Sequence, residues 1–268
     1  MAAGDTAFVG SIPAVYEELL VPTIFAEPAQ RLAESVVAAA PKKILETAAG
    51  TGVLTRALVE RSKAAITATD LNEPMLQEAA LLCTSKRVTW QVADATDLAF
   101  PDGSFDAVAC QFGVMFFPDK PKGYAEALRV LRPGGAFFFN AWDRIEANPA
   151  WRIIADTLID ATPEDPLLFL RRAPYAYFDP DQIRGDLQAA GYDEITVETV
   201  AGVSHWSVDQ ASVAVCQGTP LRMAIEAHGS MTVDAATAIA AKALRDEFGD
   251  GPFDAPISWL QVSARATS

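Results

Sequence analysis

Cysteine and histidine are scarce in this chain of 268 residues. The three cysteines, Cys83, Cys110 and Cys216, stand far apart in the sequence, and none belongs to a CxxC pair. A disulfide framework and a cysteine-based zinc site both need closely spaced cysteines, so both are disfavoured. The sequence therefore predicts a reduced protein of the cytoplasm, and we expect no metal site.

The chain also has few basic residues and lacks long apolar runs. The chain has 21 Lys plus Arg against 35 Asp plus Glu, a formal net charge of -14, and no local basic patch. Such a surface repels phosphate backbones and anionic headgroups, which argues against nucleic acid and membrane surfaces as partners. No apolar run approaches the length of a membrane span, and the N-terminus lacks a charged leader. We expect a small-molecule partner, and a homodimer is left open.

The first half of the chain alternates short apolar runs with helical patterns. An amphipathic pattern over 28–40 predicts a helix, and Pro41 ends it. Buried strands are predicted at 43–47, 64–69, 88–92, 105–112 and 136–141, and helices between them at 53–61, 74–84 and 122–131. Strands that alternate with helices form a parallel sheet with right-handed crossovers. The expected fold class is α/β, a Rossmann-like doubly wound sheet.

The second half is less regular. Helices are predicted at 151–159 and 179–190, a strand at 192–200, two helices near 209–225 and 233–248, and a last, antiparallel strand at 257–264. Nothing resembling a linker divides the chain, so we expect a single domain over 1–268. It would have an N-terminal helical segment, a cofactor-binding core at 28–142, and parts covering the substrate at 143–178 and in a helical insertion at 205–255.

A glycine-containing turn follows the first predicted strand. It reads Glu46-Thr47-Ala48-Ala49-Gly50-Thr51-Gly52, and Asp70 ends the second strand twenty residues after Gly50. In an open parallel sheet, ligands bind beyond the carboxyl ends of the strands, near the first strand. Glycines let the backbone approach a ligand closely, and a carboxylate can accept both hydroxyls of a ribose. The sequence predicts a nucleoside-containing cofactor.

Nicotinamide dinucleotides and S-adenosylmethionine both fit this outline. The dinucleotide fingerprint wants Gly or Ala where this chain has Thr55. Glu46 would oppose a pyrophosphate but suits the ammonium group of a methionine, directly or through water. Asp94, after the third strand, could accept from an adenine amino group. These features favour the sulfonium cofactor. A nicotinamide-dependent oxidoreductase is the less favoured alternative, because no Tyr-x-x-x-Lys pair or other hydride-transfer machinery is evident.

Several motifs occur in a fixed order: the turn at 46–52, Asp70-Leu71-Asn72-Glu73-Pro74-Met75-Leu76, Asp94-Ala95, Phe100-Pro101-Asp102-Gly103-Ser104-Phe105-Asp106 and Leu131-Arg132-Pro133-Gly134-Gly135. As a set they resemble the motifs of class I S-adenosylmethionine-dependent methyltransferases. The likeness is closest to the type 11 group, which includes ubiquinone and menaquinone biosynthesis enzymes. It covers about 44–142, and the order and spacing make it specific.

The resemblance implies S-adenosylmethionine as cofactor and S-adenosylhomocysteine as product. The residues that it implies as cofactor contacts are Tyr16, Glu46, Ala48, Gly50, Gly52, Gln111 and Phe112 at the methionine end, Asp70 at the ribose, and Leu71, Met75, Asp94 and Ala95 at the adenine. Ala48 and Ala49 depart from the family, which usually has glycine there. An alanine methyl is tolerable if φ stays negative, but it could weaken cofactor affinity.

The acceptor must be recognised by parts outside these motifs, around 9–25, 148–178 and the insertion. Their aromatic and apolar residues suit a planar or hydrophobic small molecule, although the same residues could equally be core. Methyl transfer is an in-line displacement, and it needs a base only if the acceptor holds its proton. His205 and Asp143 are the candidate bases, although a surface histidine is the commoner outcome. A non-catalytic cofactor-binding or regulatory protein is the alternative function.

Overall fold

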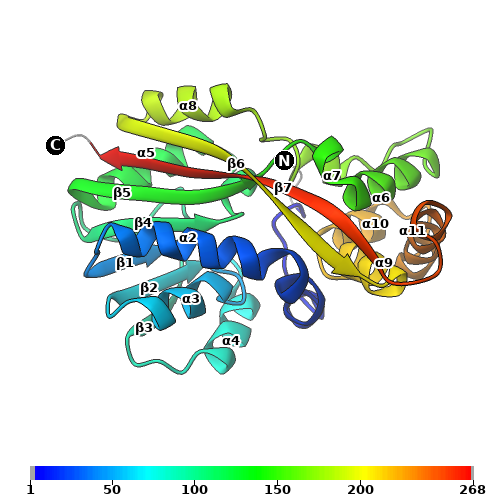
Figure 1. Cartoon of the computed structure of the whole chain (residues 1–268), viewed down its shortest axis with the longest axis horizontal. Coiled ribbons are helices and arrows are strands. Elements are labelled where there is room, and N and C mark those ends of the chain that lie inside the picture. The colour runs from blue at the N-terminus through cyan, green and yellow to red at the C-terminus, as the bar shows by residue number, and fades with distance from the viewer. Residues whose placement is uncertain (1–3, 267–268) are drawn as a thin grey trace.

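The computed structural model describes residues 4–266 and contains a seven-stranded sheet (Figure 1). The strand order is β3-β2-β1-β4-β5-β7-β6. The strands are β1 (Lys43–Glu46), β2 (Ala65–Asp70), β3 (Val88–Val92), β4 (Phe105–Gln111), β5 (Leu131–Trp142), β6 (Tyr192–Trp206) and β7 (Phe253–Ala266). The first five pair in parallel, and β7 pairs antiparallel with both β5 and β6. The predicted fold class, with an antiparallel last strand, is confirmed.

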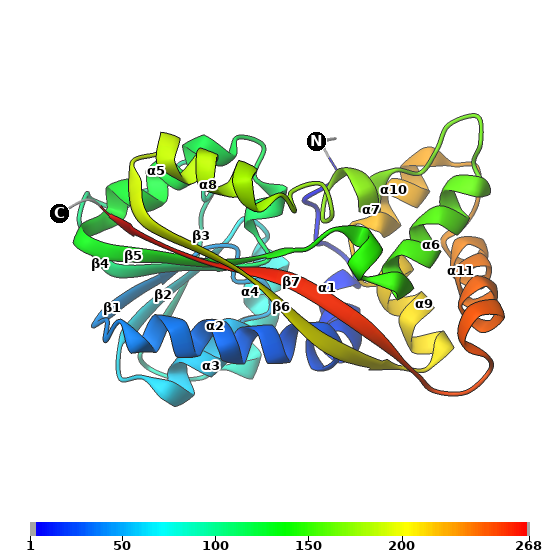
Figure 2. The ribbon, with the colours of Figure 1, turned by 45° about the horizontal axis from the view of Figure 1, so that its top comes forward.

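Helices cover both faces of the sheet, as Figures 1 and 2 show. The flanking helices are α2 (Ala26–Ala38), α3 (Val53–Arg61), α4 (Glu73–Leu82), α5 (Lys120–Val130) and α8 (Pro180–Ala189). Successive side chains of β5 point to opposite faces. Phe138 belongs to the same apolar cluster as Leu32 of α2, whereas Phe137 and Phe139 pack against Tyr124 of α5. The strands are apolar on both sides because both faces are covered.

The last two strands are longer than predicted. Their antiparallel ladder runs from Tyr192 opposite Ala266 to Trp206 opposite Phe253. The alternation that defines a half-buried strand continues beyond residue 200, because Ser204 and Trp206 are buried and the intervening His205 is exposed. The predicted insertion is therefore shorter than 205–255, and its first residues belong to the sheet.

A group of helices lies beyond one end of the sheet, where β6 and β7 extend toward it (Figure 2). Its members are α6 (Pro149–Asp160), α7 (Phe169–Arg172), α9 (Val208–Gln217), α10 (Leu221–His228) and α11 (Val233–Phe248), and a 3-10 turn, Ile145–Ala147, leads into α6. The single helix predicted near 209–225 is wrong. Gly218 ends α9, Pro220 lacks the N–H that a continuous helix needs, and the Thr219 hydroxyl bonds to the Val215 carbonyl instead.

The N-terminal segment lies between the sheet and this helical group (Figure 2). It contains α1 (Ile12–Val15) and a π-helical stretch, η1 (Tyr16–Phe25), which continues into α2. Arg56 fastens the segment to the first turn of the sheet: Arg56 donates to Glu17 Oε1 at 2.7 Å and to the Thr51 carbonyl at 2.7 Å. The predicted helical segment therefore reaches the carboxyl ends of the strands.

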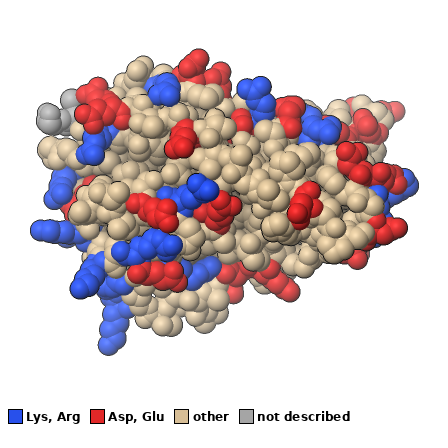
Figure 3. All heavy atoms as spheres, in the orientation of Figure 1, with Lys and Arg blue, Asp and Glu red and all other residues tan. Residues whose placement is uncertain are grey.

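Charged side chains of both signs are interspersed over the face in Figure 3, with several basic ones gathered at its lower left. Within residues 4–266, no helix combines the length and apolarity that a membrane crossing requires. The same residues contain no group of three or more His, Cys, Asp or Glu placed to hold a metal ion.

Candidate active site

A pocket of about 340 Å³ opens at the carboxyl ends of β1, β2 and β4 and beside the turn after β3. All of the residues predicted to contact a cofactor line it, except Glu46 and Gly52. Sequence reasoning missed further lining residues: Thr6, Phe8, Asn72, Ala93, Thr96, Gly113, Phe116, Phe117 and Pro118. Most of these are apolar residues, which carry no chemical signal in a sequence.

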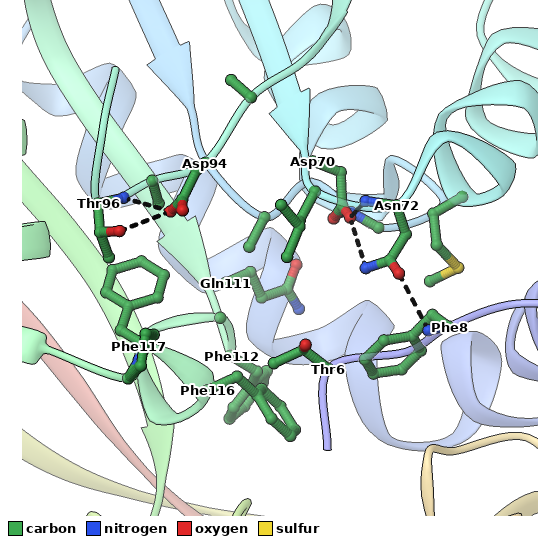
Figure 4. A pocket seen from close by; sticks show the side chains of 18 of the residues that line it. Thr6, Phe8, Asp70, Asn72, Asp94, Thr96, Gln111, Phe112, Phe116 and Phe117 are labelled. Carbon is green, nitrogen blue, oxygen red and sulfur yellow. Dashed lines mark hydrogen bonds between the residues drawn. The ribbon is translucent and has the colours of Figure 1, made fainter. Parts of the chain in front are cut away.

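Asp70 is held at the end of β2 by backbone donors. The Gly50 N–H donates to Asp70 Oδ2 at 2.9 Å, and the Asn72 N–H donates to Oδ1 at 2.8 Å. Burial raises the pKa of this carboxyl, although the N–H groups oppose that shift. The side chain faces the pocket (Figure 4). The arrangement presents fixed acceptor oxygens to a ligand that carries hydroxyl groups.

Asp94 is fixed in a similar way at the turn after β3. Its Oδ1 accepts from the Thr96 N–H at 2.7 Å and from the Thr96 hydroxyl at 2.8 Å, as Figure 4 shows. Because these local bonds satisfy one oxygen, the carboxylate keeps its place at the pocket wall beside Ala95.

Glu46 does not reach the pocket wall. Its side chain is buried behind the turn, where Thr55 donates its hydroxyl to Glu46 Oε2 at 2.5 Å. Burial raises the pKa of Glu46 to about 8, partly offset by this hydrogen bond. Glu46 is therefore not among the residues that line the pocket, and its contact with the methionine end stays a prediction. The hydrogen bond also explains Thr55, whose hydroxyl satisfies the buried carboxyl.

Three residues of the turn, Ala48, Gly50 and Gly52, adopt left-handed backbone conformations. Gly52 has φ +81° and precedes α3, and a Cβ there would lie 2.8 Å from the Trp90 ring of β3, so only glycine fits this close packing. Ala48 has φ +51°. The condition of a negative φ is therefore not met, and the alanine is strained by roughly 1–2 kcal/mol. Its methyl lies against Gly113, where a side chain would clash with it.

Gln111 and Tyr16 stand at the inner end of the pocket. Gln111 donates through Nε2 to the Phe25 carbonyl at 2.8 Å, and its buried Oε1 has no hydrogen-bond partner among the described residues. The Tyr16 ring stacks on Phe25 at 4.9 Å, and its hydroxyl lies 4.0 Å from the position of a Cβ on Gly50. Burial raises the pKa of Tyr16 well above its ordinary value, so its phenol stays neutral.

A second, smaller pocket of about 60 Å³ adjoins the first. The two share Phe8, Tyr16, Phe112 and Phe116, and the remaining wall of the second is Phe25, Met115, Trp142, Trp151, Phe169, Leu170, Pro174, Thr219 and Pro220. No acidic or basic side chain of the described residues lines it. Phe112 stacks on Trp142 at 4.1 Å between centroids, with planes 18° apart. The second pocket is therefore an aromatic and apolar chamber.

Neither candidate base lies in either pocket. His205 is exposed on β6, with Nδ1 2.6 Å from Asp254 Oδ1, so it belongs to the sheet rather than to a cover over the site. Asp143 follows β5 and accepts from the Ser258 hydroxyl at 2.8 Å. The structure therefore places both candidate bases outside the two pockets, and a role as base for either stays a prediction. The shared wall holds Tyr16 as its titratable side chain.

The class of protein follows from the fold and from where the pocket lies. It is a Rossmann-like α/β protein, and such proteins bind their ligands at the carboxyl ends of the strands, where this pocket opens next to an apolar chamber. Residues 45–139 match a family described as a methyltransferase domain. A demethylmenaquinone methyltransferase of Clavibacter sepedonicus is 32% identical over 194 residues, covering 69% of this chain and 76% of the relative. A ubiquinone/menaquinone biosynthesis C-methyltransferase of Acidiphilium cryptum is 27% identical over 174 residues, covering 60% and 70%.

The fold matches as well. A phosphoethanolamine N-methyltransferase of Haemonchus contortus, solved with S-adenosylhomocysteine, superposes with a TM-score of 0.55 at 17% identity, covering 97% of this chain and 61% of that one. The chain belongs to the class I S-adenosylmethionine-dependent methyltransferases, in the group that resembles the ubiquinone and menaquinone biosynthesis enzymes. It is an S-adenosylmethionine-dependent methyltransferase, and the nicotinamide and non-catalytic alternatives are set aside.

Proposed function

We propose that this methyltransferase acts on a small planar apolar acceptor bound in the second pocket. The observation that carries the proposal is the aromatic lining of that pocket and its shared wall with the cofactor pocket. A planar ring gains dispersion and stacking energy between aromatic side chains such as Phe112 and Trp142. One relative is named a demethylmenaquinone methyltransferase, and the other is named a C-methyltransferase of ubiquinone and menaquinone biosynthesis. Both names agree with an acceptor that contains a ring.

The residues of the first pocket fit the adenosine part of S-adenosylmethionine. Asp70 would accept the ribose hydroxyls, because its oxygens are fixed and face the pocket. Leu71 and Met75 would flank the adenine, and Leu71, 54% exposed here, would gain cover from the ring. Asp94 would accept from the adenine amino group beside the Ala95 backbone.

The methionine end fits the inner part of the pocket. Gly50 would let the ligand approach the backbone, and Ala48 and Phe112 would close around it. Gln111 Oε1 is a buried acceptor without a partner among the described residues, and an ammonium group would satisfy it. Tyr16 would lie beside this end, at the boundary of the two pockets.

When bound, the sulfonium cofactor supplies an already activated methyl group. The chain's own contribution is to align the acceptor and to exclude water. Tyr16 stays neutral, so its hydroxyl can donate a hydrogen bond to an acceptor oxygen and hold it in the chamber. No carboxylate or imidazole of the described residues lines the chamber. We therefore propose an acceptor that reaches its reactive form without a base from the protein.

The proposal also divides the chain by role. Residues 28–142 would form the cofactor-binding core. The acceptor side would come from the N-terminal segment, from the 143–178 region and from the Thr219-Pro220 turn between α9 and α10. Helices α9 to α11 would cover the chamber rather than contact the cofactor, because none of their residues lines the first pocket.

The experiment is methyl transfer from labelled S-adenosylmethionine to a panel of small acceptors. The panel contrasts planar phenols and quinols with polar amines and carboxylates of similar size. The proposal expects turnover for planar apolar members, with turnover lower by at least about tenfold for the polar ones. Turnover confined to polar members would contradict it. Binding of S-adenosylhomocysteine, measured in parallel by calorimetry, verifies that each preparation is competent.

A further inference from the structure

Asn72 joins the carboxylate of Asp70 to the N-terminal part of the chain. Its backbone N–H and its side-chain Nδ2 donate to Asp70 Oδ1, at 2.8 Å and 3.2 Å. Its side-chain Oδ1 accepts from the Phe8 N–H at 3.1 Å. Figure 4 shows the side chain between the two partners, with a dashed line on each side. Both ends of the Asn72 amide are therefore engaged.

Asn72 occupies the position before α4, where an asparagine usually caps the helix. A capping side chain bonds to a free N–H of the first helical turn. Asn72 makes no such bond. Its hydrogen-bonding capacity is directed away from the helix, toward Asp70 and Phe8, so helix capping does not explain its placement.

Residues 4–11, which we call the N-terminal strap, run past both pockets. Thr6 lines the first pocket, and Phe8 lines both. The Phe8 ring packs edge-on against Tyr16 at 6.1 Å and against Phe116 at 6.0 Å, between centroids. Because these rings form the shared wall, the position of Phe8 decides whether the chamber is closed on that side.

Two further contacts hold the strap to the helical group. Arg172 of α7 donates to Asp5 Oδ1 at 2.6 Å, and Arg222 of α10 donates to the Ser11 hydroxyl at 2.6 Å. Both ends of the strap therefore bond to the helical group, and its middle residue Phe8 bonds to Asn72 beside the first pocket. A shift of the middle contact would move Phe8 while the ends stay attached.

We propose that Asn72 is a positioning residue that couples cofactor binding to closure of the acceptor chamber. Asp70 is already held by the Gly50 and Asn72 N–H groups, and a ribose bound to it would add hydrogen bonds to the same carboxylate. The carboxylate in turn holds the Asn72 amide, which holds the Phe8 backbone, so the ligand would stabilise the whole chain of contacts. By linkage, a closed strap must in turn strengthen cofactor binding. This inference rests on the proposed function, in that it needs the ribose at Asp70.

Hydrogen exchange of the Phe8 amide, measured with and without S-adenosylhomocysteine, tests the coupling without a known acceptor. In the wild-type protein the ligand should slow exchange of this amide by at least about tenfold. In Asn72→Ala the slowing should be lost at saturating ligand. Asn72→Asp keeps an oxygen for the Phe8 N–H but loses the Nδ2 donor to Asp70, so it should restore only part of the slowing.

Ser11→Ala is the matched control, because it removes a strap contact without touching Asn72. It should keep the ligand-dependent slowing. Unchanged exchange of the wild-type Phe8 amide in the presence of bound ligand would overturn the inference, as would equal slowing in Asn72→Ala. Failure of S-adenosylhomocysteine to bind the wild-type protein would instead reject the cofactor site itself. If a variant does not fold, the wild-type measurement can still overturn the inference, because it needs no variant.

Discussion

The two pockets that meet at Tyr16 are built in opposite ways. The cofactor pocket is formed by turns at the ends of neighbouring strands, where backbone donors fix Asp70 and Asp94. The chamber beside it is formed by aromatic and apolar side chains from distant parts of the chain, among them Phe8, Trp142 and Pro220. Fixed polar groups select one ligand by hydrogen bonding, whereas an apolar chamber selects by shape. Cofactor affinity and acceptor choice should therefore respond to different mutations.

The largest expected effect concerns the buried Glu46 on the cofactor side. Its folded pKa of about 8 lies above its ordinary value of 4.5, so the folded protein binds more protons than the unfolded chain between these pH values. Stability should fall as pH rises through this window, by up to about 5 kcal/mol. Glu46→Gln should remove the part of this fall that Glu46 contributes, and the part due to the raised pKa of Asp70 should remain. Urea unfolding at several pH values measures the difference between variant and wild type.

For Glu46→Gln, the substitution Glu34→Gln at an exposed position of α2 controls for loss of an acidic side chain. A Glu46→Gln variant whose stability follows the wild-type pH dependence would show that this carboxyl is not buried as described.

The next effect is on cofactor affinity. Asp70→Ala should weaken binding of S-adenosylhomocysteine by at least about tenfold, because hydrogen bonds to an ionised group are each worth roughly 1.5–3 kcal/mol. Calorimetric titration measures it, and Asp70→Asn, which keeps an acceptor oxygen, should lose less. Unchanged affinity in a folded Asp70→Ala protein would remove the ribose assignment.

A substitution in the second pocket should affect acceptor binding and leave cofactor affinity nearly unchanged. Trp151→Phe shrinks a side chain that lines the second pocket only. It should raise the KM of the acceptor found by the panel by about threefold to tenfold. The affinity for S-adenosylhomocysteine should change by less than about twofold, because Trp151 is not among the residues that line the first pocket. Equal loss of both would mean that the two pockets are not separate.

The smallest effect is at Ala48. Replacing it by glycine relieves a left-handed φ of +51°, and the folded state should gain roughly 1 kcal/mol. Thermal or urea unfolding measures the change. The neighbouring Ala49→Gly is the matched control: Ala49 is buried and lacks a positive φ, so glycine there should destabilise. Destabilisation by Ala48→Gly would contradict the strain assigned to this turn.

The sequence predicted the lining of the first pocket better than that of the second, for a physical reason. Strand ends such as Asp70 and the 46–52 turn are local, so a short motif fixes both the residue types and their place at the edge of the sheet. It does not fix which way a side chain points. Glu46 turns inward because Thr55 satisfies it there, and Ala48 takes a positive φ that its residue type does not suggest.

The acceptor side depends on packing between distant segments. Phe8 and Pro220 lie more than two hundred positions apart in the sequence, and both line the chamber. Their meeting is set by how the helical group packs on the sheet, which no local pattern reports. His205 was misplaced for a related reason: the strand alternation extends further than its apolar residues indicate.

A crystal structure of the protein with S-adenosylhomocysteine would show whether the first pocket delivers a methyl group to the aromatic chamber. We expect the ribose at Asp70 and the adenine between Leu71 and Asp94. The sulfur should face the wall formed by Tyr16 and Phe112. A ligand in the same pocket with its sulfur directed away from that wall would contradict the proposed function, because no methyl group could then reach the aromatic chamber.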